Sequence, residues 1–210
     1  MKISEIFYSI QGEGVLIGTP TVFVRTAGCN LRCSWCDTKY AQVDNGIERS
    51  IKEIIDEVSL FPTPYVCITG GEPLLQREVF KLVNMLLEKD FKVSVETNGS
   101  ISIEELSCSE NLLISMDLKC PSSGMCDKMR LDNLELLSPF DQLKFVVADD
   151  EDMEYAKKII ESHDIQATII MMPVGGLDLK PVAEWVLRNR INVRVLPQLH
   201  KIIWGDRRGV

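Results

Sequence analysis

Three closely spaced cysteines are the residues of this chain with the clearest chemical potential. Cys29, Cys33 and Cys36 follow a C-x3-C-x2-C pattern. Iron–sulfur clusters are normally held by four thiolates, so three thiolates on one short loop leave one iron of a four-iron cluster without a protein ligand. The spacing therefore predicts a catalytic cluster with one open corner, where a substrate or cofactor can bind.

A structural zinc loop is the main alternative for the same cysteines. It would need four ligands, and no fourth thiol or histidine lies near the triplet in the sequence. The other cysteines could supply a ligand only through the fold, and they are Cys67, Cys108, Cys120 and Cys126. A second cluster on Cys108, Cys120 and Cys126 is a weaker hypothesis, because an isolated C-x5-C pair is a poor metal signal. The open cluster is the favoured interpretation.

Length and composition predict one globular domain. The chain has 210 residues, of which 45% are hydrophobic and 26% charged, so we expect residues 1–210 to form a single domain. No run approaches the ~18–20 apolar residues of a membrane helix, and the first residues lack the apolar core of a signal peptide. Seven cysteines in such a chain favour thiols and metal over disulfides. These features predict a soluble, cytoplasmic protein without a membrane contact.

The net charge argues against one class of partner. It is −8, and no basic stretch reaches five residues, whereas nucleic-acid binding depends on clustered Lys and Arg. A nucleic-acid substrate is therefore disfavoured. A small anionic substrate remains open, since a single buried Arg can hold one carboxylate through two hydrogen bonds.

The elements that must position these residues are predicted as alternating strands and helices. After an irregular first segment, buried strands are expected at 21–26, 65–69, 92–96, 112–116, 142–147, 167–171 and 193–196. Ser50-x-x-Glu53 and Ser102-x-x-Glu105 indicate helix starts, a further helix should follow Asp149 or Asp150, and Pro181 fits the first turn of another. Alternating strands and helices favour a parallel sheet, and about six repeats are too few for a closed eight-stranded barrel. We therefore predict an α/β fold with an incomplete βα barrel of about six parallel strands.

The motifs fall where such a fold does chemistry, at the carboxyl ends of its strands. Cys29 follows the first predicted strand, Gly70-Gly71-Glu72-Pro73 the second, Thr97-Asn98-Gly99 the third and Asp117 the fourth. Glycines let a backbone approach a ligand closely, and a carboxylate accepts from an ammonium group. A plain turn is the alternative for the glycine segment, and solvation of a strand end is the alternative for residues 115–117.

Together these motifs resemble the radical S-adenosylmethionine (SAM) superfamily. The resemblance rests on the cysteine loop with Trp35 before its last cysteine and on the Gly-Gly-Glu-Pro segment one strand later. It implies a [4Fe–4S] cluster whose open iron binds SAM. An external one-electron reductant such as flavodoxin or ferredoxin then starts a radical reaction. The SAM-binding residues that it implies are Gly70, Gly71, Glu72, Ser115, Met116 and Asp117.

Arg25 lies inside an apolar strand, where an unpaired guanidinium would be very costly. It must therefore have a partner. An internal Asp or Glu and a substrate carboxylate both remain open, because buried charges are usually paired.

A closer resemblance covers nearly the whole chain. Ile10-Gln11-Gly12, Arg25, Cys36-Asp37-Thr38 and Gln198-Leu199-His200-Lys201 are similar to segments of the 7-carboxy-7-deazaguanine synthase family. The family implies conversion of 6-carboxy-5,6,7,8-tetrahydropterin to 7-carboxy-7-deazaguanine with loss of ammonia, in 7-deazapurine (queuosine and archaeosine) biosynthesis. It also implies Mg²⁺, SAM in a catalytic role and a homodimer.

Residue roles follow from this resemblance position by position. The implied pterin contacts are Ile10, Gln11, Gly12, Glu13, Arg25, Thr69 and His200. Among them, Arg25 would take the substrate carboxylate and Glu13 would accept from its amino and ring N–H groups. Thr38 would bind Mg²⁺ through its hydroxyl, as one hard oxygen ligand in a shell completed by substrate and waters. A helix cap is the alternative for Thr38, and a surface or capping role is the alternative for His200.

Two other classes of function remain open at the level of the sequence. An activase that makes a glycyl radical on a protein partner shares the short chain and the cysteine loop, although Gln11, Arg25 and residues 198–201 suit a small polar ligand better. A non-enzymatic iron–sulfur or zinc binding module is the other alternative. A full βα core and a glycine-glutamate loop would be superfluous for such a module.

Overall fold

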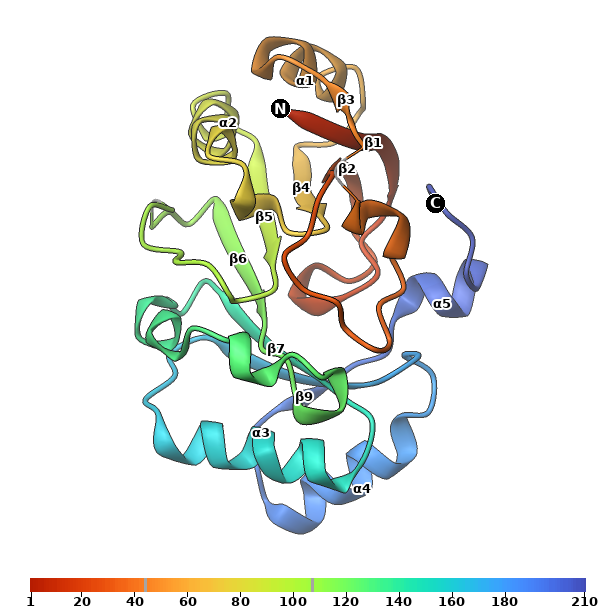
Figure 1. The fold of residues 1–210 in the computed structure, drawn as a ribbon, viewed down its shortest axis with the longest axis vertical. Helices are drawn as coiled ribbons and strands as arrows, with labels where there is room; N and C mark the ends of the chain where they lie inside the picture. The colour runs from red at the N-terminus through yellow and green to blue at the C-terminus, as the bar shows by residue number, and fades with distance from the viewer. Residues whose placement is uncertain (44, 107) are drawn as a thin grey trace.

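The computed structural model describes residues 1–43, 45–106 and 108–210, and within them nine strands form one sheet. The strand order is β3-β1-β2-β4-β5-β6-β7-β8-β9 (Figure 1). The strands span Lys2–Ile10 (β1), Pro20–Thr26 (β2), Ile47–Glu48 (β3), Tyr65–Gly70 (β4), Lys92–Thr97 (β5), Leu112–Asp117 (β6), Gln142–Val147 (β7), Thr168–Pro173 (β8) and Arg194–Val195 (β9). Strands β2 and β4 to β9 run parallel, whereas β1 and β3 pair in antiparallel fashion at one end. The predicted α/β fold with an open, incomplete barrel is confirmed.

Most helices of the described residues pack on one face of the sheet, whereas the last one, which follows β9, lies apart from them (Figure 1). The α-helices of the described residues are Ile51–Val58 (α1), Glu78–Leu87 (α2), Asp150–Ser162 (α3), Leu179–Asn189 (α4) and Leu199–Trp204 (α5). Short 3-10 turns connect them, and those used below are Lys39–Gln42 (η2) and Pro121–Ser123 (η4). None of the helices among the described residues has the length and apolar character required to cross a bilayer.

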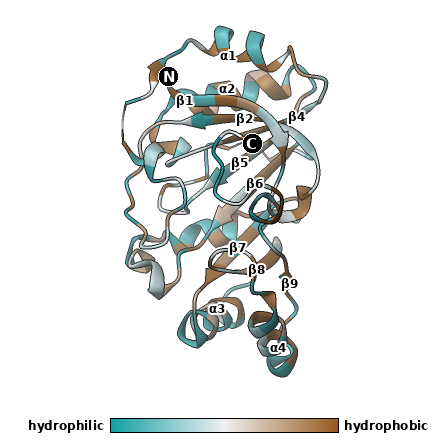
Figure 2. Cartoon of the chain, turned by 90° about the vertical axis from the view of Figure 1, so that its right-hand side faces the viewer, coloured by the Kyte–Doolittle hydropathy of each residue, from teal (hydrophilic) through white to brown (hydrophobic). Residues whose placement is uncertain are grey.

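Helix starts follow the predicted capping residues. Ser50 Oγ accepts from the Glu53 amide at 3.2 Å while Glu53 accepts from the Ser50 amide at 2.7 Å, which makes the predicted capping box of α1. Asp149 caps α3 by accepting from the Asp152 amide at 3.0 Å. Each capped helix turns its apolar stripe toward the sheet, and the outward turns of α1 are hydrophilic (Figure 2). Burial of these stripes supplies most of the stability that keeps short helices formed.

The first strand is a correction to the sequence-based prediction of an irregular segment. Residues Lys2–Ile10 form β1, which pairs with β2 along its length. The strand escaped notice because Glu5 and Ser9 interrupt its apolar pattern, and Glu5 pairs with Arg25, Tyr40 and Arg208 instead of packing in the core. Consequently Cys29 follows the second strand of the chain and not the first.

The prediction of a helix that starts after Ser102 is also wrong. Residues 102–106 form turns, in which the Ser102 hydroxyl accepts from the Glu104 amide at 3.3 Å. A serine that bonds the amide two residues later closes a local turn and competes with a capped helix. The Ser102-x-x-Glu105 pattern therefore marks a turn and not the start of a helix.

Candidate active site

A cavity of about 600 Å³ opens at the carboxyl ends of the parallel strands, between the cysteine loop and the C-terminal segment. Its wall combines residues from both ends of the chain. The predicted site residues that line it are Ile10, Gln11, Gly12, Glu13, Arg25, Cys29, Cys33, Cys36, Thr38, Thr69, Gly70, Gly71, Asp117 and His200. Three predicted residues do not reach this wall, and they are Glu72, Ser115 and Met116.

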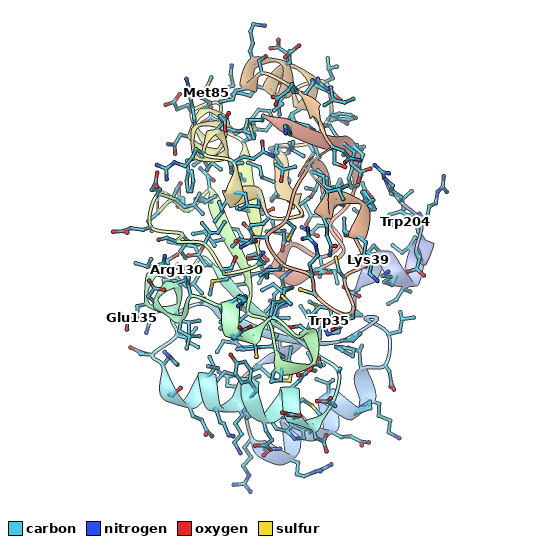
Figure 3. All side chains as sticks on the ribbon, viewed as in Figure 1. Trp35, Lys39, Met85, Arg130, Glu135 and Trp204 are labelled. Atoms are coloured by element: carbon cyan, nitrogen blue, oxygen red, sulfur yellow. The ribbon has the colours of Figure 1, made fainter. Side chains whose placement is uncertain are left out.

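The cysteine loop leaves β2 and is tied to two neighbouring segments. Cys29 Sγ accepts from the Leu31 amide at 3.4 Å and from Asn98 Nδ2 at 3.8 Å. On the other side, Trp35 Nε1 donates to Ser122 Oγ of η4 at 3.2 Å, and Figure 3 shows Trp35 beside this segment. These bonds hold the loop in place with its thiols toward the cavity.

The three thiols suit an iron–sulfur cluster chemically. Burial raises the pKa of the Cys29 and Cys33 thiols, so positive iron is the natural compensation for their thiolate forms. Among the described residues, no three Cys, His, Asp or Glu side chains lie in the arrangement that a single metal ion needs. A four-iron cluster binds three cysteines through three different irons, so its protein ligands lie farther apart than those of one ion.

Gly70 and Gly71 occupy positions where no side chain fits. A Cβ at Gly70 would lie 2.2 Å from Thr26 Oγ1, and one at Gly71 would lie 2.2 Å from the Gly28 carbonyl oxygen. The turn after β4 therefore packs backbone to backbone against the start of the cysteine loop. This close approach exposes peptide groups, rather than side chains, to the cavity.

Glu72 forms internal hydrogen bonds behind the cavity wall. Its side chain is fully buried. Its Oε1 accepts from the Leu74 amide at 3.0 Å and from Thr97 Oγ1 at 2.9 Å. Its Oε2 accepts from the Asn98 amide at 2.7 Å. Burial raises the pKa of Glu72 to about 7 despite these bonds. The carboxylate braces the glycine turn against the end of β5, so this geometry does not support its predicted contact with SAM.

Only the last of the three residues predicted at the end of β6 reaches the cavity. Met116 is fully buried in the apolar core, as alternation along a strand requires when Asp117 faces the cavity. Ser115 is covered, because it donates to Glu96 at 2.7 Å and accepts from Gln142 at 2.6 Å. Neither geometry supports the predicted SAM contacts of Ser115 and Met116.

Asp117 keeps one unused acceptor at the cavity. Its Oδ2 accepts from Lys119 Nζ at 2.7 Å, whereas its buried Oδ1 has no hydrogen-bond partner among the described residues. A buried acceptor without a donor is costly. A hydroxyl or ammonium group of a bound cofactor would satisfy it, so Asp117 fits the predicted SAM site.

Lys144, opposite Asp117 on the neighbouring strand β7, is the centre of a buried charge network at the cavity. Its Nζ donates to Glu13 at 2.8 Å and to Glu96 at 2.7 Å, and Gln198 donates to the second oxygen of Glu13 at 2.7 Å. Burial alone would raise the pKa of Glu13, but the charge of Lys144 lowers it to about 2. Each carboxylate oxygen can accept a second bond, so Glu13 can still receive a ligand donor.

Replacing Glu13 with glutamine should make stability less sensitive to acid. The pKa of Glu13 is about 2 in the folded protein, against an ordinary 4.5, so its charge stabilises the fold above about pH 4.5 and loses this effect as the pH falls toward 2. Since 20% of the side chain is exposed, we expect a contribution of about 2 kcal/mol. Urea unfolding measures it: the wild-type advantage over Glu13→Gln should be present near neutral pH and largely lost as the pH approaches 2. An advantage that is independent of pH would contradict this prediction.

The structure assigns Arg25 an internal partner. Its Nε donates to Glu5 Oε1 at 2.7 Å, and its guanidinium lies over the rings of Phe7 (5.6 Å) and Tyr40 (5.9 Å). The ion pair uses Nε, so the two terminal nitrogens remain outside that bond. Since Arg25 also lines the cavity, the geometry is compatible with both possible partners, the internal carboxylate of Glu5 and a substrate carboxylate.

Thr38 does not act as the helix cap that was its alternative interpretation. Thr38 precedes η2 without a side-chain capping bond, and its hydroxyl instead donates to Asp37 Oδ1 at 2.8 Å. The Thr38 hydroxyl and the Asp37 carboxylate thus lie together at the cavity edge, and such oxygen ligands suit Mg²⁺.

His200 on α5 packs against Gly12 so closely that a Cβ on Gly12 would lie 2.2 Å from His200 Nδ1. Helix α5 therefore docks on the loop after β1, where Leu199 N donates to the Gly12 carbonyl at 2.8 Å.

Several cavity residues escaped the sequence interpretation. They are Phe7, Tyr40 and Arg208 at the wall and Glu5 behind it. Recognition of β1 as a strand would have placed Glu5 and Phe7 on one face by alternation. No sequence signal linked Tyr40 or Arg208 to that face.

The superfamily is shown by comparison with known sequences. A profile described as the radical SAM superfamily matches residues 23–135, which include the cysteine loop, the glycine turn and β6. The chain therefore belongs to the radical SAM superfamily.

Full-length relatives narrow the assignment. The 7-carboxy-7-deazaguanine synthase of Thermoplasma acidophilum is 42% identical over 210 residues and is matched across the whole of both chains. That of Methanospirillum hungatei JF-1 is 45% identical over 204 residues, which cover 97% of this chain and 85% of the relative. Within the superfamily, the chain belongs to the 7-carboxy-7-deazaguanine synthase family.

The fold comparison agrees with this assignment. The crystal structure of QueE from Escherichia coli superimposes with a TM-score of 0.76 at 23% identity, covering 95% of this chain and 94% of the other. Family membership makes the protein a radical SAM lyase that uses a [4Fe–4S] cluster, SAM and Mg²⁺, needs a reductant and acts on a small molecule. It also sets aside the glycyl-radical activase and the non-enzymatic module.

Proposed function

We propose that this enzyme converts 6-carboxy-5,6,7,8-tetrahydropterin to 7-carboxy-7-deazaguanine with loss of ammonia, a step of 7-deazapurine biosynthesis. The observation that carries the proposal is that one cavity is lined both by three free thiols and by the Arg25 and Glu13–Lys144 groups. Such a cavity can hold a cluster-bound cofactor and a polar anionic ligand side by side. The full-length relatives named above support the same reaction.

The cofactor side of the cavity would work through a few residues. Cys29, Cys33 and Cys36 would hold the [4Fe–4S] cluster, and the cluster with SAM would supply the radical that takes a hydrogen atom from the substrate. The exposed peptide groups of Gly70 and Gly71 would lie against SAM. Asp117 would offer its unused oxygen to a hydroxyl or ammonium group.

The substrate side provides complementary charge and hydrogen bonds. The terminal nitrogens of Arg25 would hold the pterin carboxylate as a planar fork. Glu13, kept ionised by Lys144, would accept from the amino and ring N–H groups. The remaining predicted contacts at this wall are Ile10, Gln11, Gly12, Thr69 and His200. Fixing the substrate in this way positions its reacting carbon toward the cofactor.

Magnesium would bind at the edge between the two sides. Thr38 would supply its hydroxyl, and the adjacent Asp37 carboxylate would orient that hydroxyl or join the shell. Because Mg²⁺ keeps several waters and accepts substrate oxygens, two protein oxygens are sufficient. The ion would orient the substrate and neutralise charge.

Removal of the Thr38 hydroxyl should weaken magnesium binding selectively. For Thr38→Ala we expect about a 10-fold higher Mg²⁺ concentration for half-maximal product formation, with SAM cleavage in the absence of substrate unchanged. Thr63→Ala is a matched control, because Thr63 donates to the Pro20 carbonyl at 2.7 Å and lies outside the cavity wall. An unchanged Mg²⁺ requirement in Thr38→Ala would exclude Thr38 as a ligand.

The cellular setting is part of the same proposal. An external one-electron carrier such as flavodoxin or ferredoxin would reduce the cluster in the cytoplasm. Residues 1–210 would act as one domain, because the one sheet of the described residues joins both ends of the chain to the cavity. We propose that the enzyme works as a homodimer.

Anaerobic turnover tests the reaction directly. Reconstituted protein is incubated with the carboxytetrahydropterin, SAM, Mg²⁺ and a strong reductant, and the product is identified by mass spectrometry. We expect 7-carboxy-7-deazaguanine and ammonia, with SAM recovered. Consumption of SAM to methionine and deoxyadenosine without any deazaguanine would refute the substrate assignment while leaving the superfamily intact.

A further inference from the structure

A single carboxylate joins three distant segments beside the cavity. Glu5 Oε1 accepts from Arg25 Nε of β2 and from the Tyr40 hydroxyl, each at 2.7 Å. Its Oε2 accepts from Arg208 Nε of the C-terminal segment at 3.0 Å. Tyr40 lies two residues after Thr38, at the end of the cysteine loop. Glu5 therefore connects the sheet, the loop and the C-terminal segment at one point.

A local irregularity of β1 lies directly before Glu5, which pairs opposite Arg25. The pairing of β1 with β2 passes from Ile3 opposite Thr26 to Glu5 opposite Arg25, so one extra residue is accommodated between them. A bulge of this kind re-aims the side chain that follows it. From Glu5 to Ile10 the pairing is regular, so Glu5 and Phe7 lie on the same face of the sheet.

Aromatic rings complete the enclosure of the two arginines. Arg25 lies over Phe7 and Tyr40, and Phe7 stacks on Phe23 with 4.9 Å between ring centroids. The Arg208 guanidinium lies 3.9 Å from the centre of the Tyr40 ring. Glu5 and Arg25 side chains are each only 15% exposed, so their ion pair is shielded from water and restricts the guanidinium strongly.

We propose that Glu5 is a positioning residue for the reaction: it holds Arg25 by its Nε edge so that the terminal nitrogens face the cavity, and it anchors the C-terminal segment through Arg208. This rests on the proposed function, because it takes Arg25 as the site of the substrate carboxylate. Glu5 does not line the cavity wall and acts only through its partners.

The charge balance explains why a carboxylate is needed at this position. A lone Arg25 would be costly to bury, and Glu5 compensates it from behind. Arg208 adds a second positive charge to the same carboxylate, so the Glu5–Arg25–Arg208 group retains one net positive charge next to the cavity. An anionic ligand is therefore not repelled by the residue that orients its arginine.

The test compares Glu5→Ala, Glu5→Gln and the wild type in the anaerobic assay. Glu5→Ala should raise the KM for the carboxytetrahydropterin about 10- to 100-fold, because a misplaced arginine binds the carboxylate poorly. Glu5→Gln keeps an acceptor for Arg25 Nε and should show a smaller rise, and it carries the test if the alanine variant does not fold. The KM for SAM and the cluster absorbance should not change. Glu57→Gln is the matched control, since Glu57 pairs with Arg49 at 2.6 Å away from the cavity.

A second readout does not depend on turnover. Trypsin cuts after arginine, so cleavage at Arg207 and Arg208 reports detachment of the C-terminal segment by intact mass. Loss of Glu5 should accelerate this cleavage about two- to fivefold, while Glu57→Gln should not.

These measurements test the two roles of Glu5 separately. An unchanged pterin KM in both Glu5 variants, or an equal rise in the KM for SAM, would overturn the positioning role. Unaltered tryptic cleavage would overturn the anchoring of the C-terminal segment. A wild-type enzyme that fails to turn over would count against the proposed function instead, and the tryptic comparison would still decide the anchoring.

Discussion

Cys33→Ala should lose SAM cleavage and product formation by at least about 1,000-fold. Two remaining thiolates cannot hold three irons, so the cluster becomes labile and SAM loses its binding site. Cys33 was chosen because its thiol lines the cavity between Cys29 and Cys36 in sequence. Iron and sulfide analysis after anaerobic reconstitution, together with deoxyadenosine formation, measures the effect.

An exposed cysteine provides the control for this substitution. Cys108 lies outside the cavity wall and is exposed, so Cys108→Ala should bind iron and cleave SAM like the wild type. Full activity in Cys33→Ala would show that the cysteine loop does not hold the cluster. Loss of the cluster in Cys108→Ala would instead revive a ligand role for the other cysteines.

Arg25→Gln should lower kcat/KM for the carboxytetrahydropterin by about 100-fold or more, because it removes the charged partner of a desolvated carboxylate. SAM cleavage in the absence of substrate should persist, since the cysteine loop is not altered. Steady-state kinetics under anaerobic conditions, with the pterin varied at saturating SAM, measures the loss.

The interpretation needs two companion variants, because the substitution also leaves Glu5 without its ion-pair partner. Arg25→Lys keeps the charge but loses the planar fork, so it should retain stability and still bind the substrate poorly. Arg77→Gln removes an exposed arginine that pairs with Glu105 at 2.7 Å, and it should behave like the wild type. A small change for Arg25→Lys and Arg25→Gln alike would place the substrate carboxylate elsewhere.

Short-range patterns predicted most of the framework. The apolar runs that became β2, β4 and β7, and the capping box of α1, depend on residues close together in the chain. Such features follow from local propensity and burial. The cysteine loop and the glycine turn were found for the same reason, since their chemistry resides in one short segment.

Side-chain direction was harder to predict. Of the consecutive residues Ser115, Met116 and Asp117, only Asp117 reaches the cavity. Met116 faces the core by alternation, whereas Ser115 shares the face of Asp117 but is covered by Glu96 and Gln142. For Glu72, two donors to the carboxylate, Thr97 Oγ1 and the Asn98 amide, lie 25 and 26 residues away in sequence, so the motif alone did not reveal these hydrogen bonds. A sequence motif identifies candidate residues, but it does not give the orientation of their side chains.

Long-range and edge features escaped prediction altogether. Strand β1 carries Glu5 among its apolar residues and has a bulge, so its alternation of apolar and polar residues is irregular. The contact between Glu5 and Arg208 spans 203 positions, and no local pattern encodes it. These features bring Glu5, Arg25 and Arg208 together.

Electron paramagnetic resonance of the reduced protein tests the central claim most directly. The wild type is reconstituted and reduced without oxygen, and spectra are recorded before and after addition of SAM. The account predicts the signal of one reduced four-iron cluster that shifts when SAM occupies its open iron. A cluster signal that SAM leaves unchanged, or a protein that takes up zinc in place of iron, would contradict it.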